Sequence, residues 1–151
     1  MKIAYITAGA AGMYCGNCLR DHALAKAMRG LGVDFTLVPV YTPLLTDLDQ
    51  GDEVKFGGVF FNGANAYLQQ HLPYLRKPRP ILDKLLNSRA VEGILTRVSP
   101  GTDASRLGPM THSMLQGEDG KQAKEITRLA KWLKDEFRPD LIHLSNLLLI
   151  G

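Results

Sequence analysis

The sequence of 151 residues contains little cysteine, no long apolar run and no strong excess of either charge. Two cysteines are too few for the disulfide framework of a small secreted protein. No stretch reaches the ~18 apolar residues that a membrane-spanning helix needs, and the first residues lack a signal-peptide pattern. These observations lead us to expect a cytoplasmic protein.

The near balance of charge bears on the partners of the chain. Its 18 basic and 15 acidic residues leave a net charge of +3, which is too even for the clustered basic face typical of nucleic-acid binding. We therefore expect no nucleic-acid partner. Apolar residues make up 45% of the chain, enough for a hydrophobic core at this length, and we expect one domain over residues 1–151.

The first 41 residues predict a strand, a glycine-rich turn, a helix and a second strand. Residues 3–7 and 35–40 are short apolar runs typical of parallel strands covered on both faces. Gly32 stands where a left-handed residue commonly ends a helix. Apolar residues at three-to-four spacing predict the buried face of the helix: Leu19, Ala23, Leu24, Ala27, Met28 and Leu31. Such a β-α-β unit places its first turn at the carboxyl edge of the sheet, where open α/β folds bind ligands.

The glycine-rich turn is therefore the first candidate binding site. Gly9, Gly12 and Gly16 do not follow the G-x-G-x-x-G spacing of dinucleotide-binding folds, and no lysine follows them as in nucleoside triphosphatases. What remains is a backbone that a ligand can approach closely, with the amides of a helix N-terminus facing it. The alternative is a tight turn that needs glycine for its geometry alone.

Cys15 and Cys18 stand at the start of the predicted helix, as the C-x-x-C pair does in thioredoxin-like oxidoreductases. A small thiol redox protein is therefore one alternative function. A zinc site would need two further ligands, for which only His22 and His143 are candidates, and we expect no metal. Because a long glycine turn separates the first strand from the cysteines, we favour ordinary loop cysteines.

The middle of the chain predicts shorter elements. Residues 54–56 and 59–61 indicate a short strand pair or one bulged strand, and residues 64–72 indicate a helix. Pro80 suits the first position of another helix. Residues 90–98 indicate one or two helical turns.

The last third of the chain predicts a loop, a long helix and a strand. Residues 100–120 are rich in glycine and proline and predict a loop with one helical turn at 112–116. Residues 118–138 form the clearest helix, and residues 141–144 a fourth strand that we place at the centre of the sheet. The apolar stripe of the long helix contains Ala123, Ile126, Leu129, Ala130, Leu133 and Phe137. The predicted fold class is α/β, a Rossmann-like doubly wound parallel sheet in three α/β/α layers.

Five motifs follow one another along the chain: GMYCGNCLRDHALA at 12–25, LGVD at 31–34, GGVFFNG at 57–63, YLQQHLP at 67–73 and PDLIHLSN at 139–146. In this order and spacing they resemble the amino-terminal, acceptor-side domain of family-four glycosyltransferases. Those are retaining, nucleotide-sugar-dependent enzymes of the GT-B fold, built from two Rossmann-like domains. The resemblance implies transfer of a hexosyl group to a sugar, lipid or small-molecule acceptor.

The resemblance also implies where substrates bind. The first glycine loop would reach the donor phosphates and sugar. A second glycine turn would hydrogen-bond an acceptor, although turn chemistry explains its asparagine equally well. The residues after the fourth strand would contact a sugar or cap a helix, with neither role favoured. The substrate-binding candidates are Gly9, Gly12, Gly16, Asn62, Ser145 and Asn146.

Two further candidates, Arg20 and His143, each have a simpler explanation. Arg20 would meet phosphate from the start of the first helix, but a surface salt bridge is the commoner role of such a residue. His143 lies on a strand that we predict to be buried, where a core histidine with satisfied hydrogen bonds is favoured. We assign no catalytic residue from the sequence.

The chain departs from the family pattern in one respect. It lacks the second, donor-binding domain and the Glu-x7-Glu pair of the donor site, for Glu118 and Glu125 are one residue too close. The apolar residues 147–150 resemble the first turn of a helix whose remainder is missing. We therefore expect an incomplete domain that is inactive alone, with a nucleotide sugar as co-substrate and no cofactor. A non-catalytic nucleotide- or sugar-binding module is the other alternative.

Residues 71–89 form a basic amphipathic segment. Apolar residues alternate there with five cations, Arg76, Lys77, Arg79, Lys84 and Arg89. Such a segment can contact an anionic membrane or a lipid-linked acceptor. We favour a solvated helix face.

Overall fold

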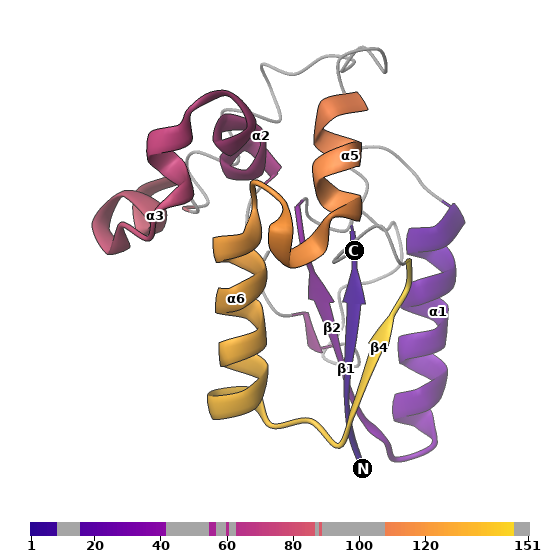
Figure 1. Cartoon of the computed structure of the whole chain (residues 1–151). Coiled ribbons are helices and arrows are strands. Elements are labelled where there is room, and N and C mark those ends of the chain that lie inside the picture. The colour runs from indigo at the N-terminus through magenta and orange to yellow at the C-terminus, as the bar shows by residue number, and fades with distance from the viewer. Residues whose placement is uncertain are drawn as a thin grey trace.

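A computed structural model of the chain describes residues 1–8, 16–41, 55–56, 60, 63–86, 88 and 108–146. It is an α/β protein with one parallel sheet (Figure 1). The strands lie in the order β3-β2-β1-β4. They are β1 (Lys2–Thr7), β2 (Asp34–Pro39), β3 (Lys55–Phe56) and β4 (Leu141–Leu144).

The β-α-β unit predicted at the start of the chain is confirmed. Helix α1 (Gly16–Gly30) connects β1 to β2, and the two strands pair in parallel with Ile3 opposite Phe35. Gly32 ends the helix with φ +78°. Its amide donates to the carbonyl of Arg29 at 2.8 Å, and the next amide donates to that of Met28 at 3.1 Å. This pair of hydrogen bonds is the Schellman motif, which favours glycine at that position.

The predicted buried face of α1 is wrong. The helix buries Cys18, Asp21, His22 and Ala25, while Leu31 just beyond its end is 79% exposed. Leu19, Ala23, Leu24 and Ala27 of the predicted face are exposed as well, and Met28 is half-buried. The helix is rotated from the position that its apolar pattern predicts because polar groups of β1 bind Asp21, as described below.

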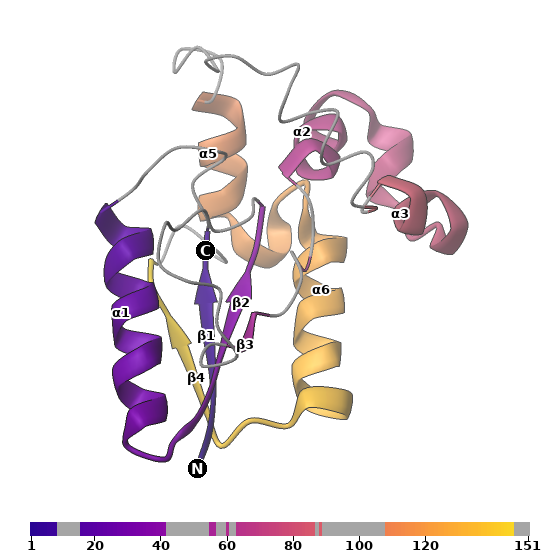
Figure 2. The same ribbon diagram turned by 180° about the vertical axis from the view of Figure 1, so that it is seen from behind.

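Helices α1 and α6 (Ala123–Trp132) cover opposite faces of the sheet (Figures 1 and 2). Alternate residues of a strand point to opposite faces, so each strand supplies both cores. On the α1 side the core contains Ile3, Tyr5, Phe35, Leu37 and Ala25. On the α6 side it contains Ala4, Ile6, Val38, Val40, Tyr41, Ala66, Leu129 and Leu133.

A group of short helices follows β3. Helix α2 (Gly63–His71) leads into a 3-10 turn η1 (Pro73–Arg76) and helix α3 (Pro80–Leu86), which begins at proline as predicted. The predicted loop at 100–120 is wrong in part, because helix α5 (Gly108–Leu115) and the 3-10 turn η3 (Gly117–Asp119) lie there. The predicted helical turns at 90–98 lie outside the described residues.

The long helix predicted at 118–138 is shorter and turned about its axis. The chain bends at Gly117, with φ +55°, and at Gly120, so α6 begins only at Ala123. A π-helical turn η4 (Leu133–Phe137) follows it. The buried side chains are Glu125, Leu129 and Leu133, whereas Ala130 of the predicted stripe is exposed.

Strand β4 forms where predicted, but its predicted central place is wrong. Within the described residues it lies at the edge of the sheet and pairs with β1. Leu141, Ile142 and His143 are exposed there. None of the helices in the described part of the chain is both long and apolar enough to cross a membrane.

The bend before α6 yields a first testable prediction. A Cβ at Gly120 would lie 2.2 Å from the carbonyl oxygen of Ser113, which also accepts a hydrogen bond from Gln122 Nε2 at 2.9 Å. The backbone must therefore move, and we expect Gly120→Ala to lower the free energy of unfolding by about 1–3 kcal/mol in urea titrations. Gly30→Ala is the matched control, because a Cβ there meets no atom within 4 Å. Equal effects of the two changes would contradict the prediction.

Candidate functional site

The carboxyl edge of the sheet brings together the ends of β1, β2 and β4. The amide of Val40 donates to the carbonyl of Thr7 at 2.7 Å, and the amide of Ser145 donates to that of Ile6 at 3.0 Å. Ser145 is half-buried and Asn146 is exposed. Both residues therefore lie beside the end of β1, at the edge where parallel α/β sheets bind ligands.

Gly16 also lies at this edge, as the first residue of α1. It is exposed, and a Cβ there would meet no atom within 4 Å. The described geometry therefore makes no steric demand for glycine at this position. The other predicted residues of the two glycine turns, Gly9, Gly12 and Asn62, lie outside the described residues, as does Cys15.

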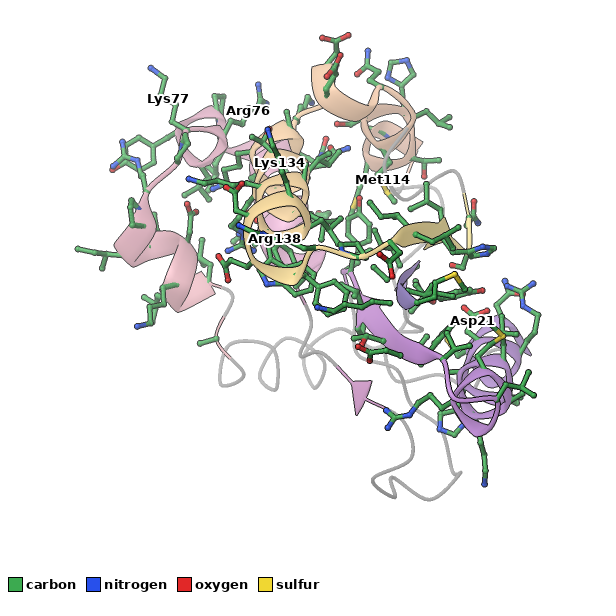
Figure 3. The ribbon with its side chains drawn as sticks, turned by 90° about the horizontal axis from the view of Figure 1, so that it is seen from below. Asp21, Arg76, Lys77, Met114, Lys134 and Arg138 are labelled. Atoms are coloured by element: carbon green, nitrogen blue, oxygen red, sulfur yellow. The ribbon has the colours of Figure 1, made fainter. Side chains whose placement is uncertain are left out.

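Asp21 is a buried carboxylate in the second turn of α1, and sequence reasoning did not select it. Its Oδ1 accepts a hydrogen bond from the hydroxyl of Tyr5 at 2.9 Å, and its Oδ2 accepts one from Thr7 Oγ1 at 2.9 Å. Figure 3 shows Asp21 on α1, the helix that packs on β1 and β2. The carboxylate thereby fixes the start of α1 against the carboxyl half of β1.

Arg20 forms an ion pair with the same carboxylate. Its Nε and Nη2 donate to Asp21 Oδ1 at 3.1 and 2.8 Å, while its side chain stays 57% exposed. The salt bridge that the sequence favoured is present, but its partner is buried. A guanidinium held in this way keeps donors for an anion, which it can bind in a bidentate geometry.

Tyr5 connects Asp21 to His143. Burial raises the pKa of Tyr5, and the hydrogen bond to Asp21 and its charge raise it further, so the hydroxyl remains a donor. The ring of His143 stacks on that of Tyr5, with centroids 4.6 Å apart and planes at 10°. The predicted buried histidine is therefore wrong, for His143 is exposed on the edge strand. His143 stacks on Tyr5 because the two residues are opposite each other in the parallel pairing of β1 and β4. The sequence alone does not reveal this pairing.

The turn after β2 contains a backbone outlier that the sequence did not signal. Tyr41 has φ +70°, and its carbonyl accepts a hydrogen bond from the amide of Gly63 at 2.5 Å. A Cβ at Gly63 would lie 3.0 Å from that carbonyl oxygen, so the close approach favours glycine. Burial raises the pKa of Tyr41 to about 12. Left-handed residues other than glycine and asparagine are costly and cluster at functional sites.

A second buried carboxylate, Glu125, lies between α6 and α2. Its Oε1 accepts hydrogen bonds from Asn65 Nδ2 at 2.9 Å and from Gln69 Nε2 at 3.4 Å. Arg128 Nη2 lies 2.9 Å from Oε2 as an ion pair. Polar contacts thus join α2 to α6, with Oε2 held by the ion pair and not by a hydrogen bond, and we assign Glu125 to the architecture.

Cys18, the described member of the predicted cysteine pair, is buried on α1. Among the residues that the structure describes, no three His, Cys, Asp or Glu side chains gather to hold a metal ion.

One hollow in the described part of the molecule lies elsewhere. It measures about 500 Å³ and is lined mostly by apolar side chains between α6 and β4, among them Ile6, Leu129, Leu133 and Ile142. Its lining includes none of the predicted substrate-binding residues that the structure describes. We therefore place the candidate site at the carboxyl edge, where Arg20, Ser145 and Asn146 present polar groups.

Comparisons with known proteins give no information about the candidate site, so its assignment rests on the geometry described above. No family model, no curated protein and no solved structure matches the chain.

Proposed function

We propose that the chain is the acceptor-side domain of a cytoplasmic, nucleotide-sugar-dependent glycosyltransferase, with a Rossmann-like doubly wound fold in three layers. The resemblance of its motifs to family-four glycosyltransferases supports this proposal. So do the parallel strand order and the helices on both faces of the sheet. A second, donor-binding domain is the partner that the reaction requires.

The observation that carries the proposal is the guanidinium of Arg20, held by a buried carboxylate in the first turns of α1. It stands next to the turn that leaves β1, at the edge of the sheet where ligands bind. A cation and the free amides of a helix N-terminus together favour a diphosphate. Asp21 acts here as a positioning residue, because it touches Arg20 rather than the ligand.

The reaction would use these groups electrostatically. The bond between the anomeric carbon of the sugar and the β-phosphate oxygen of the donor breaks, and the nucleoside diphosphate leaves. An acceptor hydroxyl oxygen bonds to that carbon, and its proton passes to the leaving diphosphate. Arg20 and the amides of α1 would stabilise the charge that develops on the leaving diphosphate, which is a large source of rate enhancement in such reactions.

An NMR titration of the purified chain with UDP- and GDP-linked hexoses tests the proposal. We expect saturable changes in the amide signals of Gly16, Arg20 and Ser145. Arg20→Ala should weaken binding about tenfold or more, because a charge-assisted hydrogen bond to phosphate is lost. Lys26→Ala, which removes a cation from the exposed side of the same helix, should leave binding unchanged.

The same samples test the need for a donor domain and the redox alternative. The chain alone should transfer no sugar above background, and sustained turnover would contradict the need for a donor domain. Reduction of insulin disulfides by the chain would instead support a thiol redox protein. If Arg20→Ala leaves nucleotide-sugar binding unchanged, the carboxyl edge is not the binding site.

A further inference from the structure

The helices α2 and α3 and the turn η1 between them carry several large apolar side chains that are exposed to solvent. Ile81 is 89% exposed, and Leu85 and Tyr74 are each 60% exposed. None of the residues of α3 is buried. Figure 1 shows α3 projecting away from the sheet beside α2. Clustered apolar exposure of this kind marks an interaction surface more often than scattered single residues do.

The inner side of α3 explains why its apolar side faces outward. Asp83 accepts a hydrogen bond from Lys124 Nζ of α6 at 2.5 Å and another from the amide of Arg79 at 2.8 Å. Ile81 and Leu85 are four residues apart and therefore share one face, next to Lys84. A polar contact holds this seven-residue helix in place, so the exposed side chains of Ile81 and Leu85 remain available to another partner.

The charge of this surface is of one sign. Among the described residues from Gly63 to Ser88, Asp83 is the only acid, and it is paired with Lys124. The cations Lys77 and Lys84 are exposed. The guanidinium of Arg79 lies over the ring of Tyr74, 3.3 Å from its centroid. The outward face therefore combines aliphatic, aromatic and cationic groups.

We propose that this face, formed by Tyr74, Lys77, Ile81, Lys84 and Leu85, docks on an anionic lipid bilayer. Ile81 and Leu85 enter the boundary of the acyl chains, while the ring of Tyr74 and the two lysines remain among the headgroups. Nucleic acid offers anions with no apolar layer behind them, so it leaves the aliphatic side chains in water. Each lysine near an anionic membrane strengthens binding only about fivefold, so the docking is reversible and weakens with salt.

The docking face is separate from the candidate substrate site. Figure 3 shows Arg76 and Lys77 on the opposite side of the molecule from Asp21. Arg76 donates to the carbonyls of Gln69 and Gln70 at 3.0 and 3.4 Å, and it thereby fixes η1 against α2. Docking and nucleotide-sugar binding can therefore be measured independently, and either proposal can fail without the other.

Sedimentation with vesicles tests the proposal. The chain should bind vesicles of equal parts phosphatidylcholine and phosphatidylglycerol, bind phosphatidylcholine alone at least about tenfold less, and dissociate at high salt. The double change Ile81→Gln/Leu85→Gln and the double change Lys77→Gln/Lys84→Gln should each reduce binding about tenfold or more. Glutamine suits a helix, and circular dichroism verifies that each variant is folded.

Leu24→Gln/Lys26→Gln is the matched control, because it removes one exposed leucine and one exposed lysine from α1. It should leave vesicle binding unchanged. Failure of the unaltered chain to bind anionic vesicles would overturn the proposal. So would equal losses in the control and the α3 variants, or a preference for duplex DNA over vesicles that Ile81→Gln/Leu85→Gln does not alter.

Discussion

Replacing Asp21 with alanine is expected to lower the free energy of unfolding by about 2–5 kcal/mol, measured by urea titration. The change leaves the hydroxyls of Tyr5 and Thr7 buried without their acceptor, and each unsatisfied group costs about 1–3 kcal/mol. Arg20 adds little to this loss, because its exposed guanidinium regains water.

Two comparisons separate the network from a general effect of losing an acid. Asp135→Ala removes an exposed carboxylate and should change the unfolding free energy by less than about 0.5 kcal/mol. In a Tyr5→Phe/Thr7→Val background, Asp21→Ala should cost markedly less, because no donors remain to be stranded. Additive effects in that cycle would contradict the assigned hydrogen bonds.

Replacing Glu125 with alanine should lower the unfolding free energy by about 3–5 kcal/mol, the cost of breaking a buried ion pair. Asn65 and Gln69 lose the acceptor that joins α2 to α6, and Arg128 loses its counter-charge. Glu136→Ala, an exposed acid on η4, is the control and should cost less than about 0.5 kcal/mol in the same urea titration.

The pH dependence of Glu125→Gln tests the same site in another way. Burial raises the pKa of Glu125 from 4.5, partly offset by Arg128 and Lys124, while Asp83 raises it further. The folded chain therefore binds this proton more readily than the unfolded chain does. That contribution to stability is complete below the unfolded pKa and is lost as the pH rises through the raised pKa. As the pH rises from the unfolded pKa of Glu125 through its raised pKa in the folded chain, the native chain should lose stability relative to Glu125→Gln, and a constant difference would contradict the shift.

The two carboxylates have different consequences for function. Asp21 orients Arg20 at the carboxyl edge, so its loss should disturb anion binding as well as stability. Glu125 holds α2, and through η1 and α3 the proposed membrane face, against α6. Loss of Glu125 should therefore weaken vesicle binding. The polar groups at the carboxyl edge of the sheet should remain in place.

The candidate site was predictable only in outline. Ser145 and Asn146 follow the end of β4 as expected, because the end of a parallel strand is visible as the end of an apolar run. Asp21 was not, since a carboxylate in a predicted helix is exposed unless something binds it. Its partners, Tyr5 and Thr7, lie 16 and 14 residues earlier, and only the packing of α1 on β1 brings them together.

The sequence by itself determined the order of the elements in the first unit and several of their ends. Short apolar runs define β1 and β2, Gly32 adopts the left-handed conformation that ends α1, and Pro80 begins α3. These features depend on local dihedral preferences and local periodicity, and both act between residues that are neighbours in the chain.

Only the tertiary structure decided which faces are buried and where β4 lies. Apolar periodicity predicts a buried face when apolar contact alone drives burial, but hydrogen bonds to Asp21 and Glu125 compensate the burial of charge here. Asn65, one hydrogen-bond partner of Glu125, is 60 residues away in the sequence. No local sequence pattern connects residues at that separation. The strand at 141–144 has the same apolar composition in a central or an edge position, and its pairing with β1 alone among the described strands decided between them.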